Sequence, residues 1–274
     1  MRPCRPRLEG ITTLKLITWN VNSIRQRLPR LLALLDRHEP DIVCLQETKV
    51  IDEAFPTMEL VAAGYHPVTF GQRAYNGVAT LARQTSTHVT RGFPGDPTPA
   101  SSRVIACRVG DLAVVNAYVV NGRAVGDPAY DTKLAWLDGF KEWVRRTYEP
   151  SDSLVIVGDF NVAPDDRDVY SPDAWRGKNL ASAAERERIS NLCSWGLTDL
   201  SRAFFGDVEG PFTFWDYRMG AFHRGWGLRI DLALATLPVM GRLAEVMVDR
   251  EERKETTGLG KPSDHAPLII TLRD

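Results

Sequence analysis

Apolar runs bounded by polar residues recur along the whole chain of 274 residues and predict its strands and helices. Short runs of mostly apolar residues are typical of buried β-strands. They lie at residues 14–20, 41–47, 77–83, 102–110, 111–119, 153–159, 229–236, 243–249 and 266–272. Apolar residues at helical spacing predict helices at residues 23–38, 128–147 and 182–196.

This pattern predicts an α/β fold in which sheets pack face to face and helices cover their outer sides. Strands outnumber helices, and hairpins mix with helical crossovers, as in a layered domain. No repeat, low-complexity tract or Gly/Ser linker divides the chain. We therefore expect one domain over residues 14–274, preceded by a flexible N-terminal arm at residues 1–13.

The composition narrows the classes of partner and compartment. The net charge is −1, so a nucleic-acid partner must be held by local basic patches or by a metal ion. No apolar stretch approaches about 18 residues, so no membrane span is expected. The four cysteines are far apart and form no Cys-x-x-Cys pair, which fits a reduced, cytoplasmic compartment.

Polar side chains gather at the mouths of several predicted strands. The clusters are Asn20 with Asn22, Gln46 to Lys49, Tyr118 with Asn121, Asp159 with Asn161, Asp231 alone, and Asp264 with His265. Any one cluster is explained as a turn, because Asp and Asn hydrogen-bond their own backbone. Asp231 is harder to explain in this way, because a buried carboxylate inside an apolar strand needs a partner. Because all six clusters lie at the ends of strands, we expect these side chains to lie together along one edge of the domain, which we call the rim.

Two carboxylates of this rim have the chemistry of magnesium ligands. Glu47 and Asp264 offer hard oxygen atoms, and Mg²⁺ takes one or two carboxylates while keeping several waters, which leaves room for a phosphate. The chain has no cluster of His and Cys that would favour zinc. The rim therefore predicts a magnesium site.

The other polar residues of the rim suit hydrolysis of a phosphodiester. His265 would donate to a phosphate oxygen while Asp231 orients its ring and favours the imidazolium. Asp159 would orient or deprotonate an attacking water. Three further residues would contact the phosphoryl group or hold Asp159, namely Asn20, Asn161 and Tyr118. These residue types predict metal-assisted hydrolysis of a phosphodiester.

Six motifs, in this order, resemble the exonuclease III family of apurinic/apyrimidinic (AP) endonucleases, in its bacterial form. They are TWNVNSIR, LQETK, NAYVVNG, GDFNVAP, GLRIDLALA and SDHAPL. The match runs from about Leu14 to Leu272. The family belongs to the endonuclease/exonuclease/phosphatase superfamily and shares its fold with deoxyribonuclease I. The resemblance implies a four-layer α/β sandwich, with two mixed β-sheets flanked by helices.

The resemblance also implies a base-excision repair enzyme that acts on double-stranded DNA. Its expected reaction is Mg²⁺-dependent cleavage 5′ to an abasic site, leaving a 3′-hydroxyl, and Mn²⁺ is expected to substitute. Blocked 3′ ends would be trimmed by 3′→5′ exonuclease, 3′-phosphatase and 3′-phosphodiesterase activities. A monomer in the bacterial cytosol is expected. Two alternatives stay open: a superfamily phosphatase or phosphodiesterase that acts on a lipid, an inositol phosphate or an RNA tail, and a degenerate domain that only binds.

The motifs carry residue roles over to this chain. Glu47 is implied as the principal metal ligand and Asp264 as the second. The wider set of implied metal contacts adds Asn20, Asp159 and Asn161. The implied catalytic residues are Tyr118, Asp159, Asn161, Asp231 and His265. In these roles Asp159 activates water, and Asp231 and His265 form a carboxylate–imidazole pair.

DNA contacts and a pocket for a flipped-out abasic sugar are the last expectations. We expect phosphate contacts from residues near the rim: Arg25, Arg73, Asn121, Arg218 and Arg224. The pocket walls implied by the family are Phe214, Trp215, Leu228 and Ile230. Large apolar residues are usually buried for packing, which is the competing explanation for Phe214 and Ile230. Trp215, followed by Asp216 and Tyr217, has the sequence context of a rim.

Overall fold

The computed structural model describes residues 13–274. Most of the predicted N-terminal arm, residues 1–12, therefore lies outside the described residues. The last residue assigned to that arm, Thr13, instead opens the first strand and pairs with Arg273.

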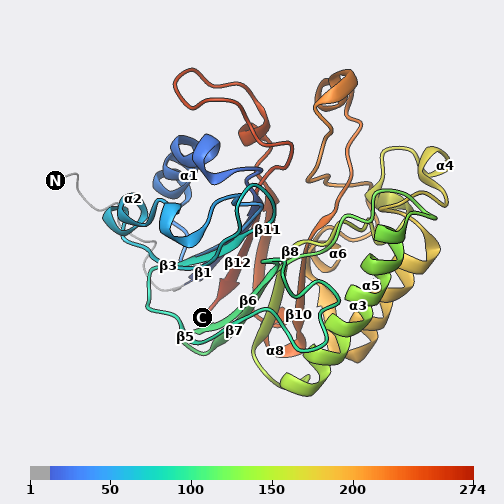
Figure 1. Ribbon diagram of the computed structural model, residues 1–274, viewed down its shortest axis with the longest axis horizontal. Helices are drawn as coiled ribbons and strands as arrows, with labels where there is room; N and C mark the ends of the chain where they lie inside the picture. The colour runs from blue at the N-terminus through green and yellow to red at the C-terminus, as the bar shows by residue number, and fades with distance from the viewer. Residues whose placement is uncertain (1–12) are drawn as a thin grey trace.

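Twelve strands in this part of the chain form two sheets of six (Figure 1). The first sheet has the order β11 (Leu243–Val248), β12 (Leu268–Arg273), β1 (Thr13–Asn20), β2 (Ile42–Gln46), β4 (Val78–Ala82) and β3 (His66–Phe70). The second has the order β5 (Thr87–Arg91), β6 (Val104–Val109), β7 (Leu112–Tyr118), β8 (Leu154–Asp159), β10 (Asp231–Thr236) and β9 (Leu197–Asp199). Both sheets are mixed, because β1 with β2 and β7 with β8 are parallel while the other pairs are antiparallel.

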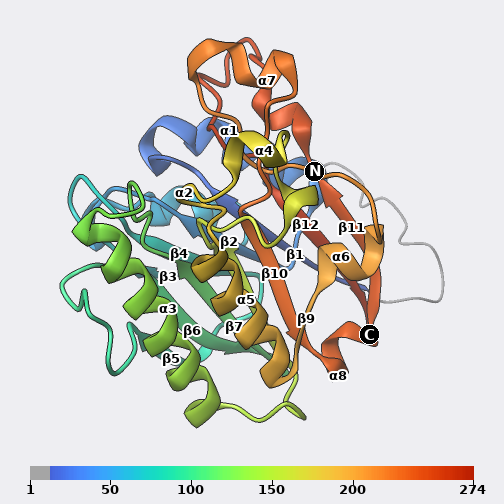
Figure 2. The same cartoon turned by 90° about the vertical axis from the view of Figure 1, so that its right-hand side faces the viewer.

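Helices cover the outer face of each sheet. On the first sheet lie α1 (Ile24–His38) and α2 (Thr57–Ala62), and on the second lie α3 (Pro128–Thr147) and α5 (Ala183–Gly196), as Figures 1 and 2 show. Apolar side chains from the inner faces of the two sheets pack together between them. The result is a sandwich of four layers, which confirms the predicted fold class.

Short helices lie in the connections. The α-helical ones are α4 (Pro172–Trp175), α6 (Leu200–Phe205), α7 (Ala221–Arg224) and α8 (Leu237–Met240). The 3₁₀ turns are η1 (Asp52–Ala54), η2 (Asp166–Asp168), η3 (Arg218–Gly220) and η4 (Arg250–Arg253). Within residues 13–274, no helix combines the length and the apolar character needed to cross a membrane.

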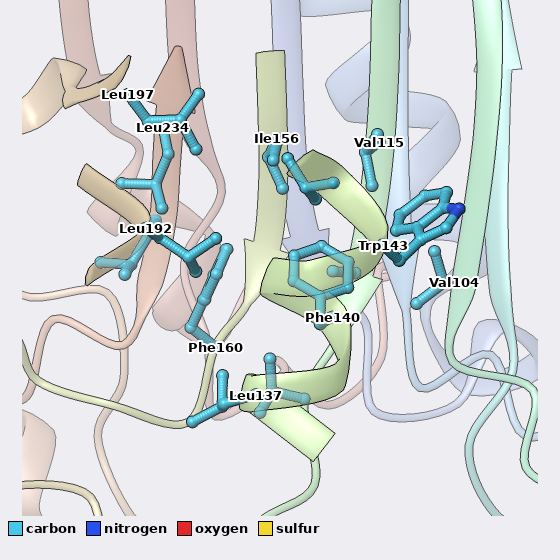
Figure 3. Packing of buried hydrophobic residues seen from close by; sticks show 14 of the residues in the cluster. Val104, Val115, Leu137, Phe140, Trp143, Ile156, Phe160, Leu192, Leu197 and Leu234 are labelled. Atoms are coloured by element: carbon cyan, nitrogen blue, oxygen red, sulfur yellow. The ribbon is translucent and has the colours of Figure 1, made fainter. Parts of the chain in front are cut away.

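Local sequence explains where the two long outer helices begin. Asp127 accepts a hydrogen bond from the backbone of Ala129, and proline at the first helical position starts α3. In α5, Ser182 and Glu185 form a reciprocal capping box. The apolar face of α3 then packs on the second sheet, as Leu137, Phe140 and Trp143 show in Figure 3. On this helix Trp136 and Phe140 also stack, with ring centroids 5.1 Å apart.

Three strands were not predicted, and all three lie at the edge of a sheet. β3 is an edge strand of the first sheet, and β5 and β9 are the two edge strands of the second; β9 has only three residues. Every residue of β5 is exposed, so this strand has no apolar run that periodicity could detect. Its pairing with β6, rather than burial, makes it a strand.

A buried amide pair joins the two sheets below one edge of the sandwich. Gln46 at the end of β2 donates from Nε2 to Asn116 Oδ1 on β7 over 2.7 Å. Asn116 in turn donates to the main-chain oxygens of Leu45 and Ala79. Because these buried polar groups are costly to leave unpaired, the bonds favour one register between the facing sheets.

Candidate active site

The directions of the strands bring the predicted rim residues to one edge of the sandwich. In the parallel pair β1 and β2, Asn20 lies opposite Gln46, and Glu47 follows directly. In the parallel pair β7 and β8, Tyr118 lies opposite Asp159, and the antiparallel β10 begins there with Asp231. Residues far apart in the sequence therefore meet at the same end of both sheets.

Glu47 is held by three polar side chains. Tyr118 donates from its hydroxyl to Oε1 over 2.7 Å, and Asn20 donates to the same oxygen over 3.1 Å. The Lys49 ammonium lies 2.7 Å from Oε2. Burial by itself would raise the pKa of Glu47, but the Lys49 charge and these hydrogen bonds hold that pKa below its ordinary value. Glu47 is therefore a carboxylate at neutral pH.

Asn20 joins this carboxylate to Asp159. Its Nδ2 donates to Asp159 Oδ2 over 2.9 Å as well as to Glu47. The second oxygen of Asp159 accepts from the backbone of Asn161 over 2.9 Å. Burial, followed by the nearby Asp231 carboxylate, raises the pKa of Asp159 to about 7, although His265 opposes the shift. A carboxylate with this pKa has the basicity of a proton acceptor near neutral pH.

His265 and Asp231 form the predicted pair. The imidazole Nδ1 lies 2.8 Å from Asp231 Oδ2, and both side chains are buried. Burial would lower the pKa of His265, but the charges of Asp231 and Asp159 raise it to about 10. The ring is thus an imidazolium that donates to Asp231 through Nδ1. Its Nε2 lies 3.8 Å from Asp159 Oδ2, so these two groups face each other without a hydrogen bond.

The ligand atoms of Asp159, Asp231 and His265 lie within 4.8 Å of one another, a spacing that a metal site also has. An imidazolium has no lone pair to offer a metal ion. This cluster therefore suits catalysis, and the oxygens best suited to a metal ion lie elsewhere on the rim.

Oxygen atoms that fit a divalent cation lie on the Glu47 side. Asn22 donates from Nδ2 to Asp264 Oδ1 over 3.0 Å, and its own Oδ1 accepts from Lys49 over 2.6 Å. Lys49 therefore bridges Glu47 and Asn22, which shows that oxygens of this edge already hold a cationic group. Hard carboxylate and amide oxygens are the donors that Mg²⁺ prefers, so the residues present fit the ion expected.

Three of the expected DNA contacts lie near these groups. Asn121 donates to Asn161 Oδ1 over 2.9 Å. Arg25 and Arg73, both exposed, line one hollow of about 450 Å³ together with Lys49. Since Lys49 touches Glu47, this hollow adjoins the rim.

The other two expected contacts lie in two consecutive short helices, since Arg218 begins η3 and Arg224 ends α7, which Figure 2 shows at the top of the molecule. Arg218 is exposed and pairs with Asp216 through two nitrogens. The Arg224 guanidinium lies over the Trp226 ring, 4.6 Å from its centroid. Neither arginine contacts a catalytic residue in the hydrogen bonds described. Their expected role on DNA stays a prediction.

The expected pocket walls are largely core. Trp215 is 0% exposed, and it packs against Ala221 and Ala266. The prediction that Trp215 lies on a rim is wrong, because its large ring is fully buried in an apolar cluster rather than exposed to solvent. Leu228 and Ile230 are only 1% and 2% exposed.

Leu228 and Ile230 belong to an apolar cluster in which Leu180 and Phe214 are partly buried. Of the four expected walls, only Phe214 reaches the surface. Its ring centroid lies 4.9 Å from that of His265. Phe214 is therefore the one expected wall that also borders the catalytic groups.

Sequence reasoning missed functional partners of the rim. Lys49 and Asn22 received no role, although both stand inside motifs, in LQETK and TWNVNS. Arg103 lies over the Tyr118 ring, 4.9 Å from its centroid, and no pattern in the sequence indicated this contact. Side chains that reach across from another element leave no local periodicity.

Comparisons with known proteins agree with this geometry. Residues 17–265 match the model of the Endonuclease/Exonuclease/phosphatase family. The chain is 34% identical to an exodeoxyribonuclease III of Haemophilus influenzae over 269 residues, which cover 93% of this chain and 98% of that protein.

Solved structures give the same result. The 3′ phosphatase NExo from Neisseria, solved with a product DNA hairpin, is 40% identical with a TM-score of 0.89, covering 94% of this chain and 98% of that one. An AP endonuclease from Archaeoglobus fulgidus is 34% identical with a TM-score of 0.89, covering 94% and 99%. With the six motifs in order and the rim assembled, this chain belongs to the endonuclease/exonuclease/phosphatase family.

Proposed function

We propose that this protein is a DNA-repair nuclease that hydrolyses the phosphodiester 5′ to an abasic site and leaves a 3′-hydroxyl. It also trims 3′ ends, as a 3′→5′ exonuclease and as a 3′-phosphatase or phosphodiesterase. The names of relatives support this proposal, since they include an exodeoxyribonuclease, a 3′ phosphatase and an AP endonuclease. The bound hairpin of the Neisseria relative supports DNA as the substrate.

The observation that carries the proposal is the buried contact between a basic carboxylate and an imidazolium. Asp159 has a raised pKa and so accepts a proton from a water that attacks phosphorus. His265, held by Asp231, presents Nε2–H to a phosphoryl oxygen on which charge develops. Asn161 and Tyr118 lie at the same edge and would contact the phosphate, while the Asn161 backbone and the Asn20 side chain hold Asp159.

Mg²⁺ is the proposed ion, with Mn²⁺ as a substitute. Glu47 and Asp264 would hold it, and Asn20 is placed to orient Glu47. A bound divalent ion supplies Lewis acidity to the phosphoryl oxygens and the leaving oxygen. We further propose that the enzyme works as a monomer in the cytoplasm.

Incision of a defined duplex tests the proposal. The substrate carries one tetrahydrofuran abasic analogue and a 5′ label, and it is incubated with Mg²⁺ or with EDTA. Metal-dependent cleavage on the 5′ side of the analogue is expected, together with release of phosphate from a 3′-phosphorylated nick. The variant Asp159→Asn serves as the control for contaminating nucleases.

The same experiment separates the alternative activity. A superfamily phosphatase or phosphodiesterase would leave both DNA substrates intact and would hydrolyse an inositol phosphate, a phospholipid or an oligoadenylate tail. Two intact DNA strands in Mg²⁺ would therefore reject the proposed repair function. Cleavage of DNA that persists in EDTA would reject the metal-dependent mechanism.

A further inference from the structure

One buried cation of the structure takes no part in the chemistry described above. Lys133 lies on α3, and its side chain is 0% exposed. Lysine is almost never fully buried unless it is paired. Its ammonium donates to Asn161 O over 2.6 Å, to Asn121 O over 3.2 Å and to Asn179 Oδ1 over 3.3 Å, and it forms an ion pair with Glu185.

Two of these acceptors belong to residues at the active edge. Asn121 follows β7 and Asn161 follows β8. The Asn161 side chain is held at both of its polar atoms, because its Oδ1 accepts from Asn121 Nδ2 and its Nδ2 donates to Val119 O over 3.0 Å. Asn161 also has a left-handed backbone with φ of 51°, which is uncommon for a residue other than glycine. The ammonium therefore holds from below the two peptide groups that set these asparagine side chains.

The other two partners anchor the ammonium to separate parts of the fold. Glu185 lies in the first turn of α5 and also accepts from the backbone of Leu180 and Ser182. Asn179 accepts from Lys133 and donates to Asn121 O over 2.9 Å. One ammonium thus joins α3, α5 and the loop before α5 to the loops after β7 and β8.

The loop beside Lys133 leaves no spare room. Gly122 has φ of +85°, and a Cβ atom built there would lie 2.9 Å from Lys133 Cδ and 2.9 Å from Asn179 Oδ1. The site is therefore closed around the ammonium, and water does not replace its hydrogen bonds at low cost.

A contribution to the free energy of folding is a weak explanation for the buried ion pair of Lys133 and Glu185. Replacing a buried ion pair by apolar residues of similar volume is often neutral or stabilising, because desolvation of two charges is costly. Burial lowers the pKa of Lys133, although Glu185 opposes the shift. What an apolar side chain cannot supply is donation to the carbonyl oxygens of Asn121 and Asn161.

We propose that Lys133 is a positioning residue for hydrolysis, whose ammonium fixes the main chain at Asn121 and Asn161 and so aims the Asn161 amide at the reacting phosphate. The inference rests on the proposed function. Because the Lys133 side chain is 0% exposed, it acts through Asn121 and Asn161 rather than by direct contact with substrate.

The test uses two double variants in which both charges of the pair are removed. Lys133→Met with Glu185→Gln has no donor at residue 133. The amide oxygen introduced by Glu185→Gln retains the capping hydrogen bonds of Ser182, and the bond from the Leu180 backbone is lost equally in both double variants. Lys133→Gln with Glu185→Gln keeps an amide donor that is one bond shorter than lysine. Because neither variant leaves an unpaired buried charge, both are expected to fold.

Arg188→Met is the matched control. Arg188 on α5 pairs with Asp138 on α3 over 2.9 Å, so it joins the same two helices, yet it contacts neither active-edge loop. Each protein is assayed for kcat and KM on the abasic duplex in saturating Mg²⁺, and for its thermal unfolding midpoint. This control separates loss of helix packing from loss of positioning.

The methionine variant is expected to lose roughly 10- to 100-fold in kcat, the scale of a misplaced catalytic group. Its KM for DNA should stay within about twofold of wild type, because the arginines expected to contact phosphate are unchanged. The glutamine variant should lose less in kcat, since a shorter amide cannot serve both carbonyls, and Arg188→Met should retain kcat. Wild-type kcat in either folded double variant would overturn the proposal, as would a loss confined to KM.

If Lys133→Met with Glu185→Gln unfolds below the assay temperature, Lys133→Gln with Glu185→Gln decides alone. A wild-type kcat in that variant, or a loss confined to KM, would overturn the proposal. Failure of the wild-type protein to incise DNA would instead count against the proposed function. An active wild type with equally active variants would count only against positioning by Lys133. The two failures are therefore distinguishable.

Discussion

The pairing of His265 with Asp231 makes a prediction that needs no metal ion. Four groups surround the imidazole: the carboxylates of Asp231, Asp159 and Asp264, and the ring of Phe214. Together the carboxylates raise the pKa of His265 from 6.5 to about 10, although burial opposes the shift. Changing Asp231 to Asn keeps the shape of the site but removes the nearest charge. We expect the pKa of His265 to fall in this variant, although Asp159 and Asp264 still raise it.

The magnitude follows from the fraction of imidazolium. At pH 8 a group with a pKa of 10 is almost fully protonated, whereas a group with a pKa of 6.5 is about 3% protonated. If the imidazolium is the form that donates to the phosphate, kcat at pH 8 should fall in Asp231→Asn, by at most roughly 30-fold, the limit reached if the pKa returns to its ordinary value. Removing the ring in His265→Ala should cost as much or more, on the order of several kcal/mol, because a preorganised donor is lost.

The direct assay is an NMR titration of the ring nitrogens of His265 in metal-free protein with EDTA present. The wild-type ring should stay protonated through pH 8 and lose its proton near pH 10. In Asp231→Asn the same signal should change at a lower pH than in the wild type. A wild-type His265 that titrates at its ordinary pKa would refute the reasoning, and so would an unchanged pKa in the variant.

Stability supplies an independent check with a definite sign. Because the folded pKa of His265 lies above the unfolded value of 6.5, its protonation stabilises the fold fully below pH 6.5. That stabilisation is lost as pH rises through about 10. Asp159, whose pKa is raised to about 7, changes charge at lower pH. The unfolding midpoints of the wild type and Asp231→Asn are therefore compared above pH 7.5. The unfolding midpoint of the wild type should therefore fall between pH 7.5 and 10 more steeply than that of Asp231→Asn.

Four further substitutions test other parts of the site. Glu47→Gln should raise the Mg²⁺ concentration needed for half-maximal rate, and an unchanged metal titration would move the principal ligand elsewhere. Asp159→Asn should abolish turnover at every Mg²⁺ concentration while a gel-shift assay still detects bound abasic duplex. Phe214→Ala should reduce incision at an abasic analogue by roughly 1–3 kcal/mol more than removal of a 3′-phosphate, and equal losses would exclude it from an abasic pocket. Trp215→Ala should lower the free energy of unfolding by about 3–5 kcal/mol and affect both substrates alike, and a variant of normal stability would contradict its place in the core.

The central strands and long helices could be predicted because their signal is local. The helix predicted at residues 128–147 is α3 with the same bounds, and that at residues 182–196 is α5 with one residue fewer. Buried strands such as β8 stand out as apolar runs. The edge strands β3 and β5 could not be found, because a pairing partner rather than a buried face stabilises them.

The residue types of the active edge could also be predicted from the sequence. Glu47, Asp159, Asp231 and His265 do meet, as the polar clusters at strand mouths indicated. The reason is topological, since parallel strands bring their carboxyl ends to one edge of a sheet. Their individual roles in binding metal and in catalysis remain predictions.

The sequence by itself determined the layered class, the long elements and the set of chemical groups, because periodicity and residue type are properties of neighbouring positions. Only the tertiary structure decided which groups share a hydrogen bond and which are shielded from water. It buried Trp215, paired Lys49 with Glu47, and enclosed Lys133 beneath Asn161. These outcomes depend on contacts between residues distant in the chain, and a pKa such as that of His265 follows from the charges that folding brings together.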